Sequence, residues 1–308
     1  MMSDPNSDTA DFSSEPSQEE MGWQLPASTE VQVDLGALSH PGRVRPNNED
    51  SYLVARLERT LTPLLTNLPP SDLPARAEEV GYGMVVADGI GGAAGGEVAS
   101  KLAIQVLVDM QVRTPDWVMR PEGLSDEEWR KRVAQRYERV GAAIKEEAEA
   151  KPSLFAMGTT LTLAYSLGSH LFLGHIGDSR AYLHRAGKLH RLTRDHTYAQ
   201  ALADLGVIRP EEVARHRMRH VLTQALSAGR APFAIELHRA WLQDGDDLLL
   251  CTDGLTDLVE DAVIAGALQG AASAVDGCRA LIDLALDRGG KDNVTVILAR
   301  YCFRTGVE

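Results

Sequence analysis

The chain has 308 residues, of which 44% are hydrophobic, and a formal net charge of -13 at pH 7. This length allows one large domain or two small ones. The acidic balance excludes the broad basic surface that nucleic-acid binding needs, so we expect no nucleic-acid partner. Cys251, Cys278 and Cys302 lie far apart without paired spacing. Such cysteines suit a reducing compartment, and we expect a cytoplasmic protein.

The N-terminal segment differs from the rest of the chain. Residues 1–30 carry seven Asp and Glu residues and no Lys or Arg. Residues 1–28 are also rich in Ser and Pro, which predicts a disordered acidic tail followed by one domain over 29–308. No basic region followed by an apolar stretch is present, so a signal peptide is not expected.

The strands and helices predicted next follow hydrophobic periodicity and turn residues. We predict strands over 31–38, 52–54, 85–86, 158–164, 171–183, from 189, over 234–242, 247–252 and 294–301. We predict helices over 97–110, from a cap at Ser125 to before Pro152, and two over 256–288 separated near Gly270. A proline-rich surface insertion is expected over 57–80.

Residues 157–177 lack Asp, Glu, Lys and Arg and are long enough to span a membrane. Their glycines, hydroxyl residues and two histidines are better explained by two strands, so no membrane partner is expected. Across the chain, strands come in adjacent groups and helices in blocks. This order favours an α+β fold of antiparallel sheets with helices packed outside them.

The segment Val85–Gly96 is a short apolar run that ends in Asp88 and continues into glycines and a helix. Alone, Asp88-Gly89 would be an ordinary hairpin turn. Residues 89–94 also fit the G-x-G-x-x-A form of a dinucleotide-binding fingerprint, which would indicate an oxidoreductase. The Asp88 carboxylate disfavours that alternative because it would lie beside a bound pyrophosphate.

Other carboxylates also stand at the ends of predicted strands. The full set is Glu49, Asp50, Asp88, Asp178, Asp253 and Asp292. Hard divalent cations prefer such oxygen ligands, and two ions can share one bridging carboxylate. His216 and His220 have the spacing of zinc ligands on a helix, but the neighbouring arginines favour a solvated basic helix face.

Six short motifs, in order, resemble those of the metal-dependent protein phosphatases of type 2C, in their bacterial form. They are Arg45-x-x-x-Glu49-Asp50, Asp88-Gly89-x-Gly91-Gly92, Gly158-Thr159-Thr160, Gly177-Asp178-Ser179-Arg180, Asp253-Gly254 and Gly290-Lys291-Asp292-Asn293. The resemblance implies a four-layer α-β-β-α sandwich of two antiparallel β-sheets flanked by helix pairs. It also implies a binuclear Mn2+ or Mg2+ site at one end, beside a flap over 195–230.

The resemblance also implies a role for each motif residue. Asp88 would bridge two ions, with the Gly89 carbonyl on one of them and Asp253 and Asp292 on the other. Glu49 and Asp50 would act through waters, Arg45 would clamp phosphoryl oxygens, and Asn293 would support its neighbours. Asp178 would hold a weak third ion together with Asp253; a bland alternative is that it pairs with Arg180 or caps a bulge at Gly177.

The implied activity is hydrolysis of phosphoserine and phosphothreonine in proteins by a metal-activated water, without a phosphoenzyme. Ile90 stands where many family members have a histidine thought to protonate the leaving group, so that role is unassigned; a water on the third ion would fill it. Phosphoproteins would be the substrates of a monomer that opposes a serine/threonine kinase. The alternatives are an inactive phosphatase-like binding module and, less favoured, the oxidoreductase.

Overall fold

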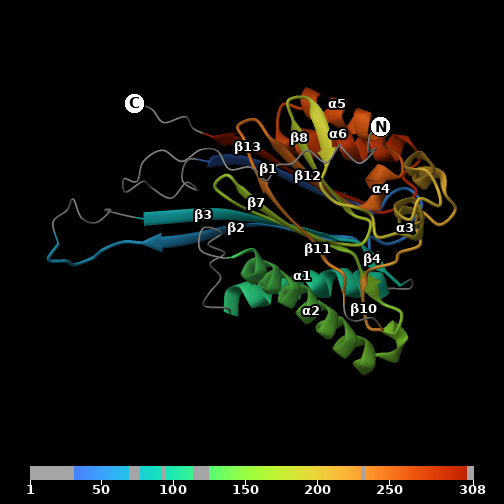
Figure 1. Ribbon diagram of the computed structural model, residues 1–308, viewed down its shortest axis with the longest axis horizontal. Coiled ribbons are helices and arrows are strands. Elements are labelled where there is room, and N and C mark those ends of the chain that lie inside the picture. The colour runs from blue at the N-terminus through green and yellow to red at the C-terminus, as the bar shows by residue number, and fades with distance from the viewer. Residues whose placement is uncertain (1–30, 69–76, 92–94, 114–124, 230–232, 304–308) are drawn as a thin grey trace.

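The computed structural model describes residues 31–68, 77–91, 95–113, 125–229 and 233–303. The predicted acidic tail over 1–28 lies outside these residues. Two five-stranded sheets stack face to face, and helices cover the outer face of each (Figure 1).

The first sheet contains the strands nearest to both ends of the described chain. Its order is β1 (Val31–His40), β13 (Val294–Phe303), β12 (Asp247–Cys251), β8 (Arg180–Arg185) and β9 (Lys188–Arg191). Every pairing in it is antiparallel, and β13 lies between β1 and β12.

The second sheet has the order β11 (Glu236–Trp241), β7 (His170–Ile176), β6 (Leu161–Leu167), β3 (Ala77–Ala87) and β2 (Ser51–Leu61). It too is antiparallel throughout. β2 and β3 form a long hairpin that extends beyond the body of the molecule (Figure 1). The insertion predicted over 57–80 is therefore too wide, because both strands continue into it and leave only 62–76 between them.

Four longer helices form the outer layers. α1 (Gly95–Arg113) and α2 (Asp126–Ala150) cover the second sheet, whereas α5 (Asp261–Gly270) and α6 (Ala274–Asp287) cover the first (Figure 1). Ser125 caps α2 as predicted, since its hydroxyl accepts the Glu128 N–H and the Glu128 carboxylate accepts the Ser125 N–H. The helix ends at Ala150, before Pro152.

Three apolar clusters lie between the four layers. The central cluster joins the inner faces of the sheets, with Leu171 and Leu173 on one side and Leu250 and Ile297 on the other. The other two clusters lie under the helix pairs. This arrangement confirms the predicted four-layer sandwich. It contradicts the dinucleotide-binding alternative, which requires a parallel βαβ unit after Val85–Ala87.

The shorter elements gather at one end of the sandwich. β4 (Gly89–Ile90), β5 (Gly158–Thr159) and β10 (Leu226–Ser227) form a small third sheet, which was not predicted. α3 (Tyr198–Asp204), the 3-10 helix η5 (Pro210–Arg215) and α4 (Asp253–Thr256) lie at the same end (Figure 1); another 3-10 turn, η4 (Pro152–Leu154), follows α2.

The topology shows how two long apolar stretches of the sequence fold. The run predicted as one strand over 171–183 is two strands, because β7 belongs to the second sheet and β8 to the first. Residues 157–177 contain the two predicted strands, β6 and β7, joined by a turn at 168–169, and also the short strand β5, which was not predicted separately. Within the part of the chain that the structure describes, no helix combines the length and apolar character needed to cross a membrane.

Candidate metal centre

The predicted aspartates all lie where a strand or helix begins or ends. Asp50 precedes β2, Asp88 joins β3 to β4, Asp178 joins β7 to β8, Asp253 opens α4, and Asp292 lies two residues before β13. Burial raises the pKa of Asp88 well above its usual range, and the charges of the other four aspartates raise it further. The fold therefore gathers five carboxyl groups from distant parts of the sequence into one cluster.

Asp50 is held by two threonine hydroxyls. Its Oδ2 accepts the hydroxyls of Thr252 at 2.9 Å and Thr295 at 2.7 Å. Its Oδ1 is buried and has no hydrogen-bond partner among the residues that the structure describes. Burial raises the pKa of Asp50 to about 7, against the effect of both hydroxyls and with help from the charges of Asp253 and Asp292. A cation would satisfy this carboxyl group.

Thr160 holds Asp88 through the backbone. The Asp88 N–H donates to Thr160 Oγ1 at 3.0 Å, and the Thr160 N–H donates to the Asp88 carbonyl at 2.9 Å. The same hydroxyl contacts Ser179 Oγ at 2.8 Å, next to Asp178. These contacts explain why the Gly-Thr-Thr motif lies at the site although it contributes no carboxylate.

Asp178 is 8% exposed, and burial followed by the charge of Asp253 raises its pKa well above the usual range. Arg180 donates to Asp195 from Nε at 3.1 Å and from Nη2 at 2.8 Å, and to the Tyr182 hydroxyl from Nη1 at 3.0 Å. The alternative in which Asp178 is the ion-pair partner of Arg180 is therefore wrong. The charge of Asp178 in turn raises the pKa of Asp88, which groups Asp178 with the other aspartates.

Asn293 braces the loop that carries the first motif. Its Oδ1 accepts the Glu49 N–H at 2.8 Å, and its Nδ2 donates to the carbonyls of Pro41 at 2.9 Å and Asn47 at 2.8 Å. Three bonds from one buried amide fix this loop against β13. Asn293 thus connects the loop before β2 to the beginning of β13.

Arg45 lies at the solvent side of the cluster. Its Nη2 donates to Asp292 Oδ2 at 2.7 Å, and 55% of its side chain is exposed. This hydrogen bond raises the pKa of Arg45 and the nearby charges of Glu49 and Asp253 add to the effect. The guanidinium therefore stays charged beside the carboxylates while remaining open to solvent.

Glu49, Gly89 and Gly254 complete the predicted set. The Glu49 carboxylate lies against Gly96 in the first turn of α1, where the Gly89 carbonyl also approaches. A Cβ on Gly254 would lie 1.9 Å from the Asn293 carbonyl oxygen. Glycine at this position is what allows α4, which begins at Asp253, to approach the Asp292-Asn293 segment.

His220 is a neighbour of the cluster that sequence reasoning missed. Its Nδ1 lies 3.8 Å from Asp253 Oδ2, and its Nε2 lies 3.3 Å from Asp257 Oδ2. The nearby carboxylate of Asp253, together with the charge of Asp257, raises the pKa of His220. The basic helix face predicted around His216 and His220 is wrong, because η5 ends at Arg215 and residues 217–220 are turns. No sequence spacing indicated this long-range contact.

Comparison with known proteins identifies the class to which this fold and site belong. The chain matches the family model described as "Protein phosphatase 2C" over residues 72–285. It is 38% identical over 267 residues to serine/threonine protein phosphatase PstP of Mycobacterium tuberculosis. The aligned region covers 85% of this chain and 44% of that protein. The chain therefore belongs to the protein phosphatase 2C family.

Particular relatives and their structures agree with this assignment. Serine/threonine phosphatase stp of Listeria monocytogenes is 33% identical over 215 residues, covering 70% of this chain and 82% of that protein. The crystal structure of M. tuberculosis PstP matches with a TM-score of 0.70 at 35% identity, over 87% of this chain and 98% of the crystallised one.

A second structure bears on the metal. The catalytic domain of PstP in complex with two manganese ions matches with a TM-score of 0.67 at 34% identity, over 88% of this chain and 99% of that domain. Our chain spans 44% of the full PstP relative, so the match to solved structures concerns the catalytic domain. The predicted fold class is confirmed.

Proposed function

We propose that this chain hydrolyses phosphoserine and phosphothreonine in proteins, with two Mn2+ or Mg2+ ions and without a phosphoenzyme. The observation that carries the proposal is the burial of Asp88 among four other aspartates at the ends of the strands. Family membership and the relatives named serine/threonine phosphatases support it. The family resemblance extends the domain over 29–308, with 195–230 as its flap.

The residues present fit divalent metal ions. All donors in the cluster are oxygens, as Mn2+ and Mg2+ prefer, and the buried Asp50 Oδ1 has no other partner. Asp88, the Gly89 carbonyl, Asp253 and Asp292 would hold two ions, with Glu49 and Asp50 acting through waters and Asp178 with Asp253 at a weaker third position. Bound ions would supply charge stabilisation and activate a water as the nucleophile.

Protein groups would provide substrate binding and placement. Arg45 is exposed and charged, so it can donate two hydrogen bonds to phosphoryl oxygens. Thr252 and Thr295 fix Asp50 through one oxygen and leave the other free. Thr160 fixes the backbone of Asp88. The role left open by Ile90 would fall to a water ordered near Asp178.

We further infer a monomeric enzyme that opposes a serine/threonine kinase in the cytoplasm. Phosphoprotein substrates follow from the names of the relatives. Two buried free cysteines and one exposed free cysteine in the described chain support a reducing compartment. No nucleic-acid or membrane partner is proposed.

Activity assays with and without metal test the proposal. We expect Mn2+-dependent hydrolysis of phosphoserine and phosphothreonine peptides that a chelator abolishes. Asp88→Asn should lose at least about tenfold in rate, since metal-derived stabilisation is worth several kcal/mol. Its metal-free thermal stability should hold or rise, because a repelled charge is removed. A folded wild-type chain that binds Mn2+ but hydrolyses no phosphopeptide would favour the inactive binding module instead.

A further inference from the structure

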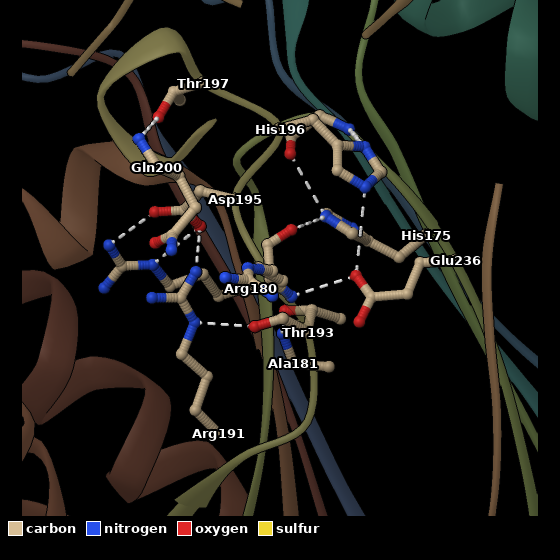
Figure 2. A network of polar contacts seen from close by, with 12 residues as sticks. His175, Arg180, Ala181, Arg191, Thr193, Asp195, His196, Thr197, Gln200 and Glu236 are labelled. Carbon is tan, nitrogen blue, oxygen red and sulfur yellow. Dashed lines mark hydrogen bonds and ion pairs between the residues drawn. The ribbon is translucent and has the colours of Figure 1, made fainter. Parts of the chain in front are cut away.

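A second polar cluster lies behind the aspartates, at the base of the flap. It consists of His175 on β7, His196 before α3 and Glu236 on β11, whose side chains point toward one another (Figure 2). Potential ligand atoms of the three residues lie within 4.8 Å of one another. These distances would suit a metal ion, and the hydrogen bonds of the two imidazoles decide whether the cluster is available to bind one.

Both imidazoles are already committed to hydrogen bonds. His175 Nε2 lies 3.1 Å from the Gly177 carbonyl and 3.1 Å from the Arg194 carbonyl, so this nitrogen must carry a proton. His175 Nδ1 accepts the Thr162 hydroxyl at 2.8 Å. His196 Nδ1 accepts the Gly177 N–H at 3.2 Å. This arrangement is a hydrogen-bond network and not a free ligand set.

His196 forms hydrogen bonds with both the N–H and the carbonyl of Gly177. Besides the bond to Nδ1, the His196 N–H donates to the Gly177 carbonyl at 2.7 Å. Gly177 has φ +116°, and a Cβ there would lie 2.5 Å from Thr160 Cβ. Gly177 is therefore held between His196 and Thr160, and Asp178 is the next residue.

His196 also helps to connect the beginning of the flap, residues 195–230, with its later part near residue 223. Its carbonyl accepts the Thr223 N–H at 2.7 Å, and the next residue, Thr197, forms a β-bridge with Leu222. His220, two residues before Leu222, contacts Asp253. Glu236 holds the preceding segment by accepting the Arg194 N–H at 2.9 Å.

We propose that His196 is a positioning residue that sets the affinity of the Asp178 metal position and couples it to the base of the flap. The His196 Nδ1 acts by accepting a hydrogen bond from the Gly177 N–H. Without this acceptor the Gly177 N–H loses its hydrogen-bond partner. Asp178, the next residue, is then no longer fixed relative to Asp88 and Asp253. This inference rests on the proposed metal-dependent function and concerns geometry behind the site.

Replacing the Nδ1 acceptor tests the proposal. In His196→Leu the acceptor is lost, whereas in His196→Asn the amide oxygen can occupy the place of Nδ1. We expect calorimetric Mn2+ titration of His196→Leu to show two tight sites as in wild type and at least a tenfold weaker third. His196→Asn should restore that affinity to within about threefold. His196→Gln, whose amide reaches one bond farther, should behave like His196→Leu and replaces it if that variant does not fold.

Two controls separate positioning from general loss of stability. Ile144→Ala creates a cavity under α2, where the Ile144 side chain is fully buried and far in sequence from the cluster, and should lower the melting temperature without changing Mn2+ affinity. In an Asp178→Asn background, His196→Leu should change Mn2+ binding no further, because both changes act on one position.

The outcomes are distinct. Wild-type third-site affinity in His196→Leu and His196→Gln, an equal weakening in Ile144→Ala, or additivity with Asp178→Asn would each overturn the positioning role. A wild-type chain that binds no Mn2+ at all would instead overturn the proposed function. If His196→Leu then also melts at the wild-type temperature, the hydrogen bonds of His196 do not stabilise the Gly177 segment, and the inference is overturned as well.

Discussion

Arg45 is bound to a predicted metal ligand and exposed to solvent at the same time. Its bond to Asp292 orients the guanidinium over the cluster, and its exposed edge is left for a second anion. A sequence pattern can place an arginine four residues before Glu49, but it cannot reveal the partner from residue 292. The structure adds a direct contact between the arginine proposed to bind phosphate and an aspartate proposed to bind metal.

We expect Arg45→Ala to lower kcat/KM for phosphopeptides by a factor that corresponds to roughly 1.5–3 kcal/mol, the value of a charge-assisted hydrogen bond. Tight Mn2+ binding should persist, because Asp292 keeps its carboxylate. Calorimetry and steady-state kinetics measure the two effects. Arg43→Ala is a matched control, since Arg43 pairs at 3.6 Å with Asp287 on the exposed surface. Lost Mn2+ affinity with normal kcat/KM at saturating metal would reverse the assignment.

Asp178 has a prediction of its own. We expect Asp178→Ala to retain two tight metals, lose a weak third and lose most turnover on phosphopeptides. Hydrolysis of p-nitrophenyl phosphate should suffer less, because its leaving group has a low pKa and needs less protonation. Parallel assays of both substrates measure the difference. Equal slowing of the two would exclude a role near the leaving group.

At the scale of elements, the turn between β7 and β8 moves the chain from one sheet to the other. From the sequence, the apolar residues on both sides of this turn are predicted as one strand over 171–183. The break between two strands is missed because buried strands of either sheet have the same composition. Gly177 was the available signal of the break. Capping residues gave better information: Ser125 correctly marked the beginning of α2, because a cap is a local interaction.

The same turn predicts a pH effect on stability through His175. Burial, followed by the charge of His196, lowers the pKa of His175 to about 4. The folded chain therefore keeps His175 neutral while the unfolded chain takes up a proton below its ordinary pKa of about 6.5. The stability is present above about pH 6.5 and is lost as the pH falls toward 4, at up to about 1.4 kcal/mol per pH unit.

Urea unfolding of metal-free protein between pH 4.5 and 6.5 measures this loss. We expect His175→Gln, which cannot titrate, to be less stable overall but to show a shallower pH dependence than wild type. Glu236, Asp195, Arg191 and His196 face the ring in both proteins, so their contributions largely cancel in the comparison. Identical slopes would show that His175 does not take up a proton on unfolding.

At the scale of the molecule, most of the sandwich was predictable and most of the flap was not. Strands, helices and the outer helix pairs follow periodicity that is visible in the sequence. Residues 205–221 are turns and a 3-10 helix whose positions depend on long-range contacts such as that of His220 with Asp257. The aspartates proposed as metal ligands could be named from motifs, whereas Thr252, Thr295 and His196 required the assembled structure.

Metal binding should stabilise the whole chain. Ions that neutralise the buried aspartates bind the folded state alone, so the free energy of unfolding should rise by about 2.7 kcal/mol at a free Mn2+ concentration 100 times Kd. Thermal unfolding with increasing Mn2+ measures the rise. Asp88→Asn should show little of it, and a wild-type melting temperature that does not respond to Mn2+ would contradict the metal centre.

The position of β13 has a consequence for synthesis of the chain. β1 pairs with β13 alone in the first sheet, from Val31↔Phe303 to His40↔Val294. A ribosome adding about 5–20 residues per second needs on the order of tens of seconds to travel from β1 to β13. During this time β1 lacks its neighbour, and β12, once it is synthesised, lacks the same neighbour until β13 follows, so both present open strand edges. The growing chain should therefore depend most on chaperone protection just before its last strand emerges.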